Sequence, residues 1–237
     1  MKLTTKQLLQ FYGWSENPDI DECAKKAYLD VARTMKYRKA STDLTDLAQE
    51  KDNYLQGITK LIREKIERLF LENEVNEEDF QRWHECTCEM IVDDSKSCEV
   101  IEKFHYGHAQ KWLNMTLKNM MIVGVEVVNA KHSLEDLASF FHVPIDTLIM
   151  RVISREYKIK LPLGKDPSLY DEYYGPLTRG ENKGKYVYNP GNKFLSWSNW
   201  DKEQYIQVQG ELQEKIKDEN KSPLEWEFAA WIRARDD

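Results

Sequence analysis

Two charged residues stand where they could carry out chemistry together. Lys111 is the last residue of the segment 107–111, at the expected start of an apolar helix. Asp146 stands at the expected start of another helix. A lysine near the positive end of a helix, in a partly apolar cleft, can act as a nucleophile because both surroundings disfavour its charged form. An ionised aspartate beside it can stabilise a carbon that becomes cationic. This pair predicts the chemistry of base excision from DNA.

The elements that must position the pair are helices. From Asp21 to about Ala130, apolar residues recur every three or four positions, as on a buried helix face. Ser133 is suited to cap a short helix, Pro144 must interrupt the helical pattern, and Pro223 suits the first turn of the last helix. The expected helices cover 21–36, 44–72, 77–92, 109–123, 134–141, a stretch beginning near Asp146, 198–217 and 223–235.

The fold class predicted from this pattern is all-α, with two lobes and one long loop. Residues 161–195 hold four prolines and five glycines among tyrosines and lysines, which is typical of a long loop or a small insertion. We expect residues 1–45 to pack with the C-terminal lobe, residues 46–160 to form the lobe that carries Lys111 and Asp146, and residues 196–237 to form the C-terminal helices.

Composition restricts the class of protein further. The chain has 237 residues and a net charge of −7, so it is long enough for a substantial core and is not an indiscriminate polyanion binder. The N-terminus has no apolar leader and no stretch is long and apolar enough to span a membrane. Four cysteines in so large a chain are expected as free thiols. We therefore expect a cytoplasmic monomer without metal or cofactor.

The surroundings of the pair resemble a known family. Gly107-His-Ala-Gln-Lys111 is similar in spacing to the helix-hairpin-helix turn of the DNA glycosylase superfamily that includes endonuclease III and the 8-oxoguanine glycosylases. Residues 145–152, Ile-Asp-Thr-Leu-Ile-Met-Arg-Val, resemble the segment of that superfamily that carries its essential aspartate. The separation of lysine and aspartate is closest to that of the archaeal 8-oxoguanine glycosylases. The resemblance covers about residues 100–155.

The resemblance implies a role for each matched residue. Lys111 would be the nucleophile that forms a Schiff base with the sugar, and Asp146 would activate the amine and stabilise positive charge. Gly107, His108, Ala109 and Arg151 would contact the DNA backbone of a duplex that carries a damaged or modified base. Ala109 stands where the superfamily has a second glycine, Leu148 stands where some members have a histidine, and the iron–sulfur cysteines of endonuclease III are absent.

A base pocket is expected from five further residues. These are Trp83, His84, Gln110, Asn114 and Trp226, which offer rings for stacking and polar groups for reading a base edge. The plainer interpretation is that the aromatic residues belong to the core and that Gln110 and Asn114 form a polar stripe on one helix face. The histidines and cysteines between 84 and 108 could suggest zinc, but they contain no Cys-x-x-Cys pair, so we expect no metal site.

Two functions remain as alternatives to a DNA glycosylase with possible lyase activity. One is a noncatalytic helical module that binds DNA or another protein. The other is a phage-defence or counter-defence protein built on the same scaffold. The acidic net charge favours these alternatives, because phosphate contacts dominate DNA affinity. The lysine–aspartate pair favours the enzyme.

Overall fold

Helices make up most of the fold, as the sequence predicts. The structure is a computed structural model that describes residues 4–38, 44–164, 173–176, 186–189 and 194–236. Its helical elements are α1 Thr5–Phe11, α2 Ile20–Ala32, α3 Leu44–Leu71, α4 Glu77–Ser97, α5 Tyr106–Val123, α6 Leu134–Leu137, η1 Ala138–Phe140, α7 Thr147–Arg155, η3 Trp197–Asn199, α8 Lys202–Asp218 and α9 Pro223–Asp236.

Two small antiparallel sheets accompany the helices. Strand β1 (Lys36–Tyr37) pairs with β2 (Ile101–Lys103), and β3 (Tyr173–Pro176) pairs with β4 (Tyr186–Asn189). The second pair lies inside the segment expected as a loop, so the described part of 161–195 contains a hairpin. Neither sheet was predicted, because strands of two to four residues are too short to show an alternating pattern.

Side-chain caps explain where several helices begin. The carboxylate of Asp19 accepts a hydrogen bond from the Glu22 amide at the start of α2, and the Asn76 side chain accepts from the Asp79 amide at the start of α4. Ser133 and Asp146 cap α6 and α7 in the same way. Each cap satisfies an amide that has no partner within the helix. The α5 helix ends at Gly124, whose φ of 69° favours glycine.

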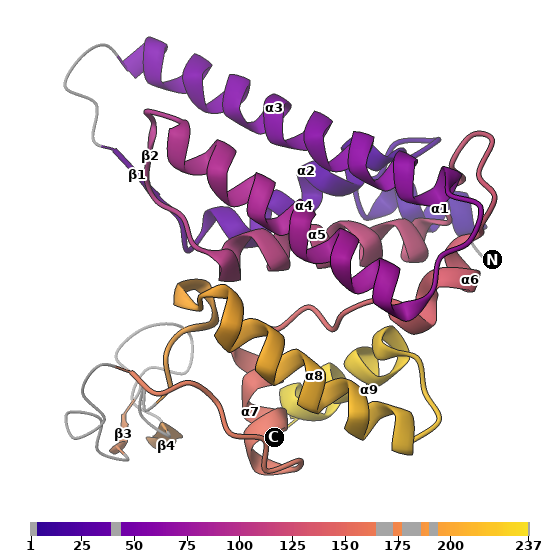
Figure 1. Cartoon of the computed structure of the whole chain (residues 1–237). Coiled ribbons are helices and arrows are strands. Elements are labelled where there is room, and N and C mark those ends of the chain that lie inside the picture. Colours follow the sequence, from indigo (N-terminus) through magenta and orange to yellow (C-terminus); the bar gives the residue numbers. More distant parts are fainter. Residues whose placement is uncertain (1–3, 39–43, 165–172, 177–185, 190–193, 237) are drawn as a thin grey trace.

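The helices form two layers, which we call the N-terminal and C-terminal lobes (Figure 1). The N-terminal lobe contains α2 to α5, and the C-terminal lobe contains α7, α8 and α9. The expectation that residues 1–45 pack with the C-terminal lobe is wrong, because α2 packs against α5 and α3 within the N-terminal lobe. Its apolar face fits there: Cys23, Ala24 and Ala27 are fully buried.

Helix α5 lies at the centre of the molecule. Ala109, Trp112 and Leu113 are completely buried on it, and it contacts α2, α4, η3 and α8. The Trp112 indole donates to the Ala24 carbonyl of α2, and the Asn119 amide donates to the Cys23 carbonyl. A linker, residues 141–146, then carries the chain from η1 to α7, and its first five residues are buried.

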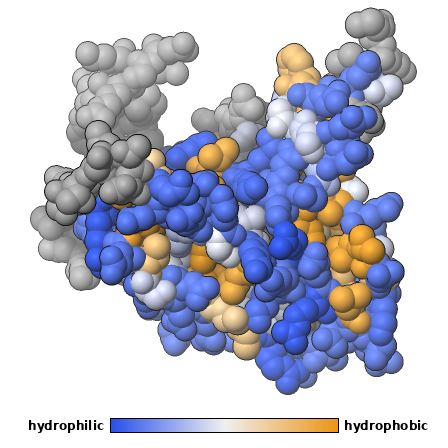
Figure 2. Space-filling model, turned by 90° about the horizontal axis from the view of Figure 1, so that it is seen from above, coloured by the Kyte–Doolittle hydropathy of each residue, from blue (hydrophilic) through white to orange (hydrophobic). Residues whose placement is uncertain are grey.

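The face of the molecule seen in Figure 2 is mostly polar. Hydrophilic residues cover most of it, and the apolar residues on it form separate patches. In the part of the chain that the structure describes, none of the helices combines the length and the apolar character that a membrane crossing requires.

Gly107 provides a test of the packing between α5 and η3. A Cβ atom at this position would lie 1.9 Å from the Trp197 carbonyl oxygen, so Gly107→Ala should lower the free energy of unfolding by about 3 kcal/mol, at the upper end of overpacking costs. Urea unfolding measures this change. Gly210→Ala in α8 is the matched control, because nothing lies within 4 Å of its added Cβ, and it should stabilise the protein by about 0.5–1 kcal/mol. Equal effects of the two substitutions would contradict the packing.

Candidate functional site

Lys111 and Asp146 meet where the two lobes join. The Lys111 Nζ atom lies 3.4 Å from Asp146 Oδ2 and 3.3 Å from the Pro144 carbonyl oxygen. The lysine side chain is 5% exposed and the aspartate side chain is 27% exposed. The pair therefore forms one site, although the two residues come from different lobes. The part of the site that solvent reaches is the Asp146 carboxylate.

Asp146 has a second function at this site. Its Oδ1 atom accepts a hydrogen bond from the Ile149 amide, while Oδ2 faces the lysine. One carboxylate thus caps α7 and pairs with α5. The cap fixes the carboxylate relative to the helix, and the Pro144 carbonyl fixes the direction from which the amine approaches it.

The position of Lys111 within its helix differs from the prediction. Helix α5 begins at Tyr106, three residues earlier than expected, so Lys111 is its sixth residue and lies in the second turn. The influence of a helix dipole falls off within the first turn. Burial and the contacts with the linker, rather than the helix end, set the surroundings of this amine.

The predicted hairpin turn at residues 107–109 is wrong. These residues are helical, and their amides already have acceptors: Gly107 N donates to the Trp200 carbonyl, and the amides of His108 and Ala109 donate to the His105 carbonyl. All three residues are buried. They cannot present amides to a DNA phosphate in this structure, and the glycine serves instead for close contact with η3.

Arg151, by contrast, is exposed on α7. Arg155 follows one turn later and is also exposed, and Lys158 and Lys160 extend the basic surface beyond the helix. The side chains between them, Val152, Ile153 and Ile159, are buried. Arg151 and Arg155 therefore lie on the helix that Asp146 caps, and Lys158 and Lys160 follow it in the chain.

Three of the five expected pocket residues form a buried polar cluster. His84 Nε2 lies 2.8 Å from Asn114 Oδ1, and Asn114 Nδ2 donates to Gln110 Oε1 at 3.1 Å. Each of the three is at most 1% exposed. These residues form hydrogen bonds with one another, because buried polar groups need partners.

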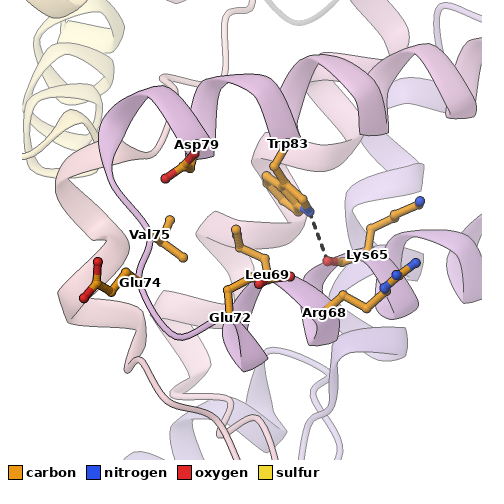
Figure 3. A pocket seen from close by; sticks show the side chains of 8 residues that line it. All are labelled: Lys65, Arg68, Leu69, Glu72, Glu74, Val75, Asp79 and Trp83. Atoms are coloured by element: carbon orange, nitrogen blue, oxygen red, sulfur yellow. Dashed lines mark hydrogen bonds between the residues drawn. The ribbon is translucent and has the colours of Figure 1, made fainter.

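The two tryptophans expected in the same pocket lie elsewhere. Trp83 borders a surface hollow of about 390 Å³ between the end of α3 and the start of α4, and its indole donates to the Lys65 carbonyl (Figure 3). Trp226 is buried in the C-terminal lobe, where its ring packs against Tyr157 and its indole donates to the Tyr157 hydroxyl. Lys111 and Asp146 do not line the hollow, so the five residues do not form a single pocket.

Sequence reasoning missed two members of the buried cluster. Tyr205 is not among the residues that the sequence predicts for the site, yet its hydroxyl accepts from Asn114 Nδ2 at 2.9 Å. His142 is not predicted either, although its Nδ1 lies 2.8 Å from the same hydroxyl. The only available signal for His142 was its place immediately before the Val143-Pro144-Ile145-Asp146 segment.

A second ion pair joins α5 to the C-terminal lobe. Lys118 contacts both carboxylate oxygens of Glu227 on α9, at 2.6 and 2.8 Å, and Glu227 is 1% exposed. Lys118 lies seven residues, two helical turns, after Lys111. The two lysines therefore form comparable contacts along one helix, with the aspartate of α7 and the glutamate of α9.

Burial sets the protonation of the histidines. It lowers the pKa of His84 to about 4 and the pKa of His108 to about 4, because the charged ring would lose its hydration. Burial also places the pKa of His142 well below the usual value, and the nearby His84 lowers it further. These rings are neutral at pH 7. Among the residues described here, no group of three or more potential ligands is placed to hold a metal ion.

The buried histidines predict a loss of stability in acid. Unfolded histidines bind protons below a pH of about 6.5, whereas the folded ones stay neutral to lower pH, so the free energy of unfolding should fall between pH 6.5 and 4. The slope should approach about 1.4 kcal/mol per pH unit for each such histidine. Urea unfolding across this range measures it. His84→Gln keeps a donor for Asn114 and should reduce the slope by up to about 1.4 kcal/mol per pH unit, the contribution of one proton. An unchanged slope would contradict the assignment of a neutral ring to His84.

No family model, no curated protein and no solved structure matches this chain.

Proposed function

We propose that the chain excises a base from duplex DNA, with Lys111 as the nucleophile and Asp146 as the residue that activates it. The observation that carries the proposal is the contact of 3.4 Å between the amine and the carboxylate. These residues are 35 positions apart and belong to different helices, so their meeting is a property of the fold. The resemblance of residues 145–152 to the glycosylase segment is consistent with this role.

The proposed reaction begins with proton transfer from Lys111 to Asp146. The neutral amine attacks C1′ of the sugar, and the bond between C1′ and the base breaks as the base leaves with the electron pair and takes up the proton that Asp146 holds. The carboxylate restored in this way stabilises the positive charge that develops on the sugar. Opening of the sugar ring then gives an imine between Lys111 and C1′, from which β-elimination nicks the strand.

Borohydride trapping tests the nucleophile. Duplexes that carry 8-oxoguanine, uracil or an alkylated base are incubated with the protein and the reductant, and the imine should be fixed as a covalent adduct. Lys111→Gln should abolish the adduct, and Asp146→Asn, which can still cap α7, should slow its formation by about 100-fold or more. Denaturing electrophoresis and mass spectrometry of the adduct measure both.

The second ion pair supplies the matched control. Lys118→Gln combined with Glu227→Gln removes a similar charge pair from the same helix without touching the proposed centre. This double variant should still form the adduct. If every duplex gives neither an adduct nor alkali-sensitive strand cleavage, base excision is excluded for those bases. Excision without an adduct would make Asp146 the activator of a water molecule instead.

The α7 surface is proposed to bind the DNA backbone. Arg151→Gln and Arg155→Gln should each weaken binding to any duplex, because each removes a cation that can neutralise a phosphate. Each should also reduce by about 1 the slope of log affinity against log salt concentration. Fluorescence anisotropy at several salt concentrations measures both quantities. Arg33→Gln, just after α2, removes an exposed arginine of the other lobe and should leave both quantities unchanged. Equal effects of all three substitutions would contradict the assignment.

One observation favours a second function, a noncatalytic helical module. The Lys111 side chain is only 5% exposed, so the ion pair is also suited to holding α7 against α5. In that function the pair would contribute stability, and the α7 surface alone would bind a partner. The trapping experiment separates the two, because a noncatalytic module forms no adduct.

A further inference from the structure

The linker between the lobes is held by a buried histidine. Residues 141–145 are buried, and the chain from His142 to Asp146 forms neither helix nor strand. A buried segment of irregular structure needs other partners for its polar groups. His142 bonds to both lobes: Nε2 lies 2.8 Å from Gln81 Oε1 of α4, and Nδ1 lies 2.8 Å from the Tyr205 hydroxyl of α8.

The chemistry of the partners fixes the direction of these hydrogen bonds. Gln81 Nε2 donates to the Glu85 carboxylate at 2.9 Å, so the Gln81 oxygen faces His142 and must accept. The neutral ring therefore carries its hydrogen on Nε2 and accepts on Nδ1, and Tyr205 is the donor to it. The Tyr205 oxygen in turn accepts from Asn114 Nδ2 of α5. One oriented chain thus connects α4, the linker, α8 and α5.

The linker also carries both groups that contact Lys111. The Pro144 carbonyl is two residues after His142, and the Asp146 carboxylate is four residues after it. A shift of the linker moves both groups relative to Lys111, whose helix is fixed by its own core. Lys111 therefore keeps its two contacts only while His142 keeps its place.

We propose that His142 and Tyr205 are positioning residues: through their hydrogen bond they hold the linker where Pro144 and Asp146 meet the Lys111 amine. The proposal rests on the proposed function only in treating this amine as reactive. The Tyr205 hydroxyl bonds to Asn114 and His142, so its effect on Lys111 passes through His142 and the linker backbone.

The test measures the Lys111 amine itself. Folded protein at pH 8 is treated briefly with formaldehyde and a borane reductant, and mass spectrometry gives the ratio of methylation at Lys111 to that at Lys118, the ion-paired lysine of the same helix. In Tyr205→Phe this ratio should rise about fivefold. The loss of one net hydrogen bond raises by about this factor the fraction of molecules in which the linker has moved away from the Lys111 amine. Tyr54→Phe is the matched control, because it removes a buried hydroxyl that bonds to Ser95 away from the linker, and its ratio should equal that of the unchanged protein.

A second variant keeps the test decisive if Tyr205→Phe does not fold. Gln81→Met removes the side-chain oxygen that accepts from His142 Nε2, at the half-buried end of the hydrogen-bonded chain. It should also raise the ratio of Lys111 to Lys118 methylation. Equal ratios in the folded variants and the unchanged protein would overturn the proposal, whatever the activity on DNA. If base excision is found, the same variants should lower kcat with little change in KM. Absence of excision with altered ratios would reject the proposed function alone and leave the positioning role standing.

Discussion

The structure depends on the need to pair the polar side chains of one buried helix. Helix α5 is enclosed by both lobes, yet its polar side chains include Gln110, Lys111, Asn114, Lys118 and Asn119. A buried polar group without a partner costs about 1–3 kcal/mol, and a buried charge costs more. Each neighbour of α5 therefore supplies a specific partner. The arrangement of α2, α4, α7, α8 and α9 around it follows from these pairs as well as from apolar burial.

The same need for polar partners determines how the two lobes contact each other. A purely apolar contact would tolerate sliding, because the hydrophobic effect has no direction. The contact here is directional: α5 meets α7 through Asp146, α8 through Tyr205 and α9 through Glu227. A histidine of the linker completes the set. A few hydrogen bonds and ion pairs thus join the two lobes at α5, in addition to apolar burial.

Stability and reactivity make different demands on the lysine–aspartate pair. Breaking a partly buried ion pair leaves an uncompensated charge, so the pair stabilises the contact between α5 and α7. A nucleophile must instead be reached by its substrate. The 27% exposure of the Asp146 side chain provides the open side of the pair, and the cations of α7 lie on the element that presents it. The proposed chemistry requires DNA to approach from this direction.

The longer helices and most of their ends could be predicted from the sequence, since a repeat of three to four residues and a capping side chain are local signals. Asp146 was correctly placed at a helix start for that reason, and the order of Lys111 and Asp146 suggested that they act together. Tertiary structure decided what local signals cannot express. Residue 107, predicted to lie in a turn, is helical, and it must be glycine because the Trp197 backbone leaves no room for a Cβ atom. His142 and Tyr205 became partners only through folding, because contacts between residues 63 positions apart depend on how helices pack, and no spacing in the sequence records that packing.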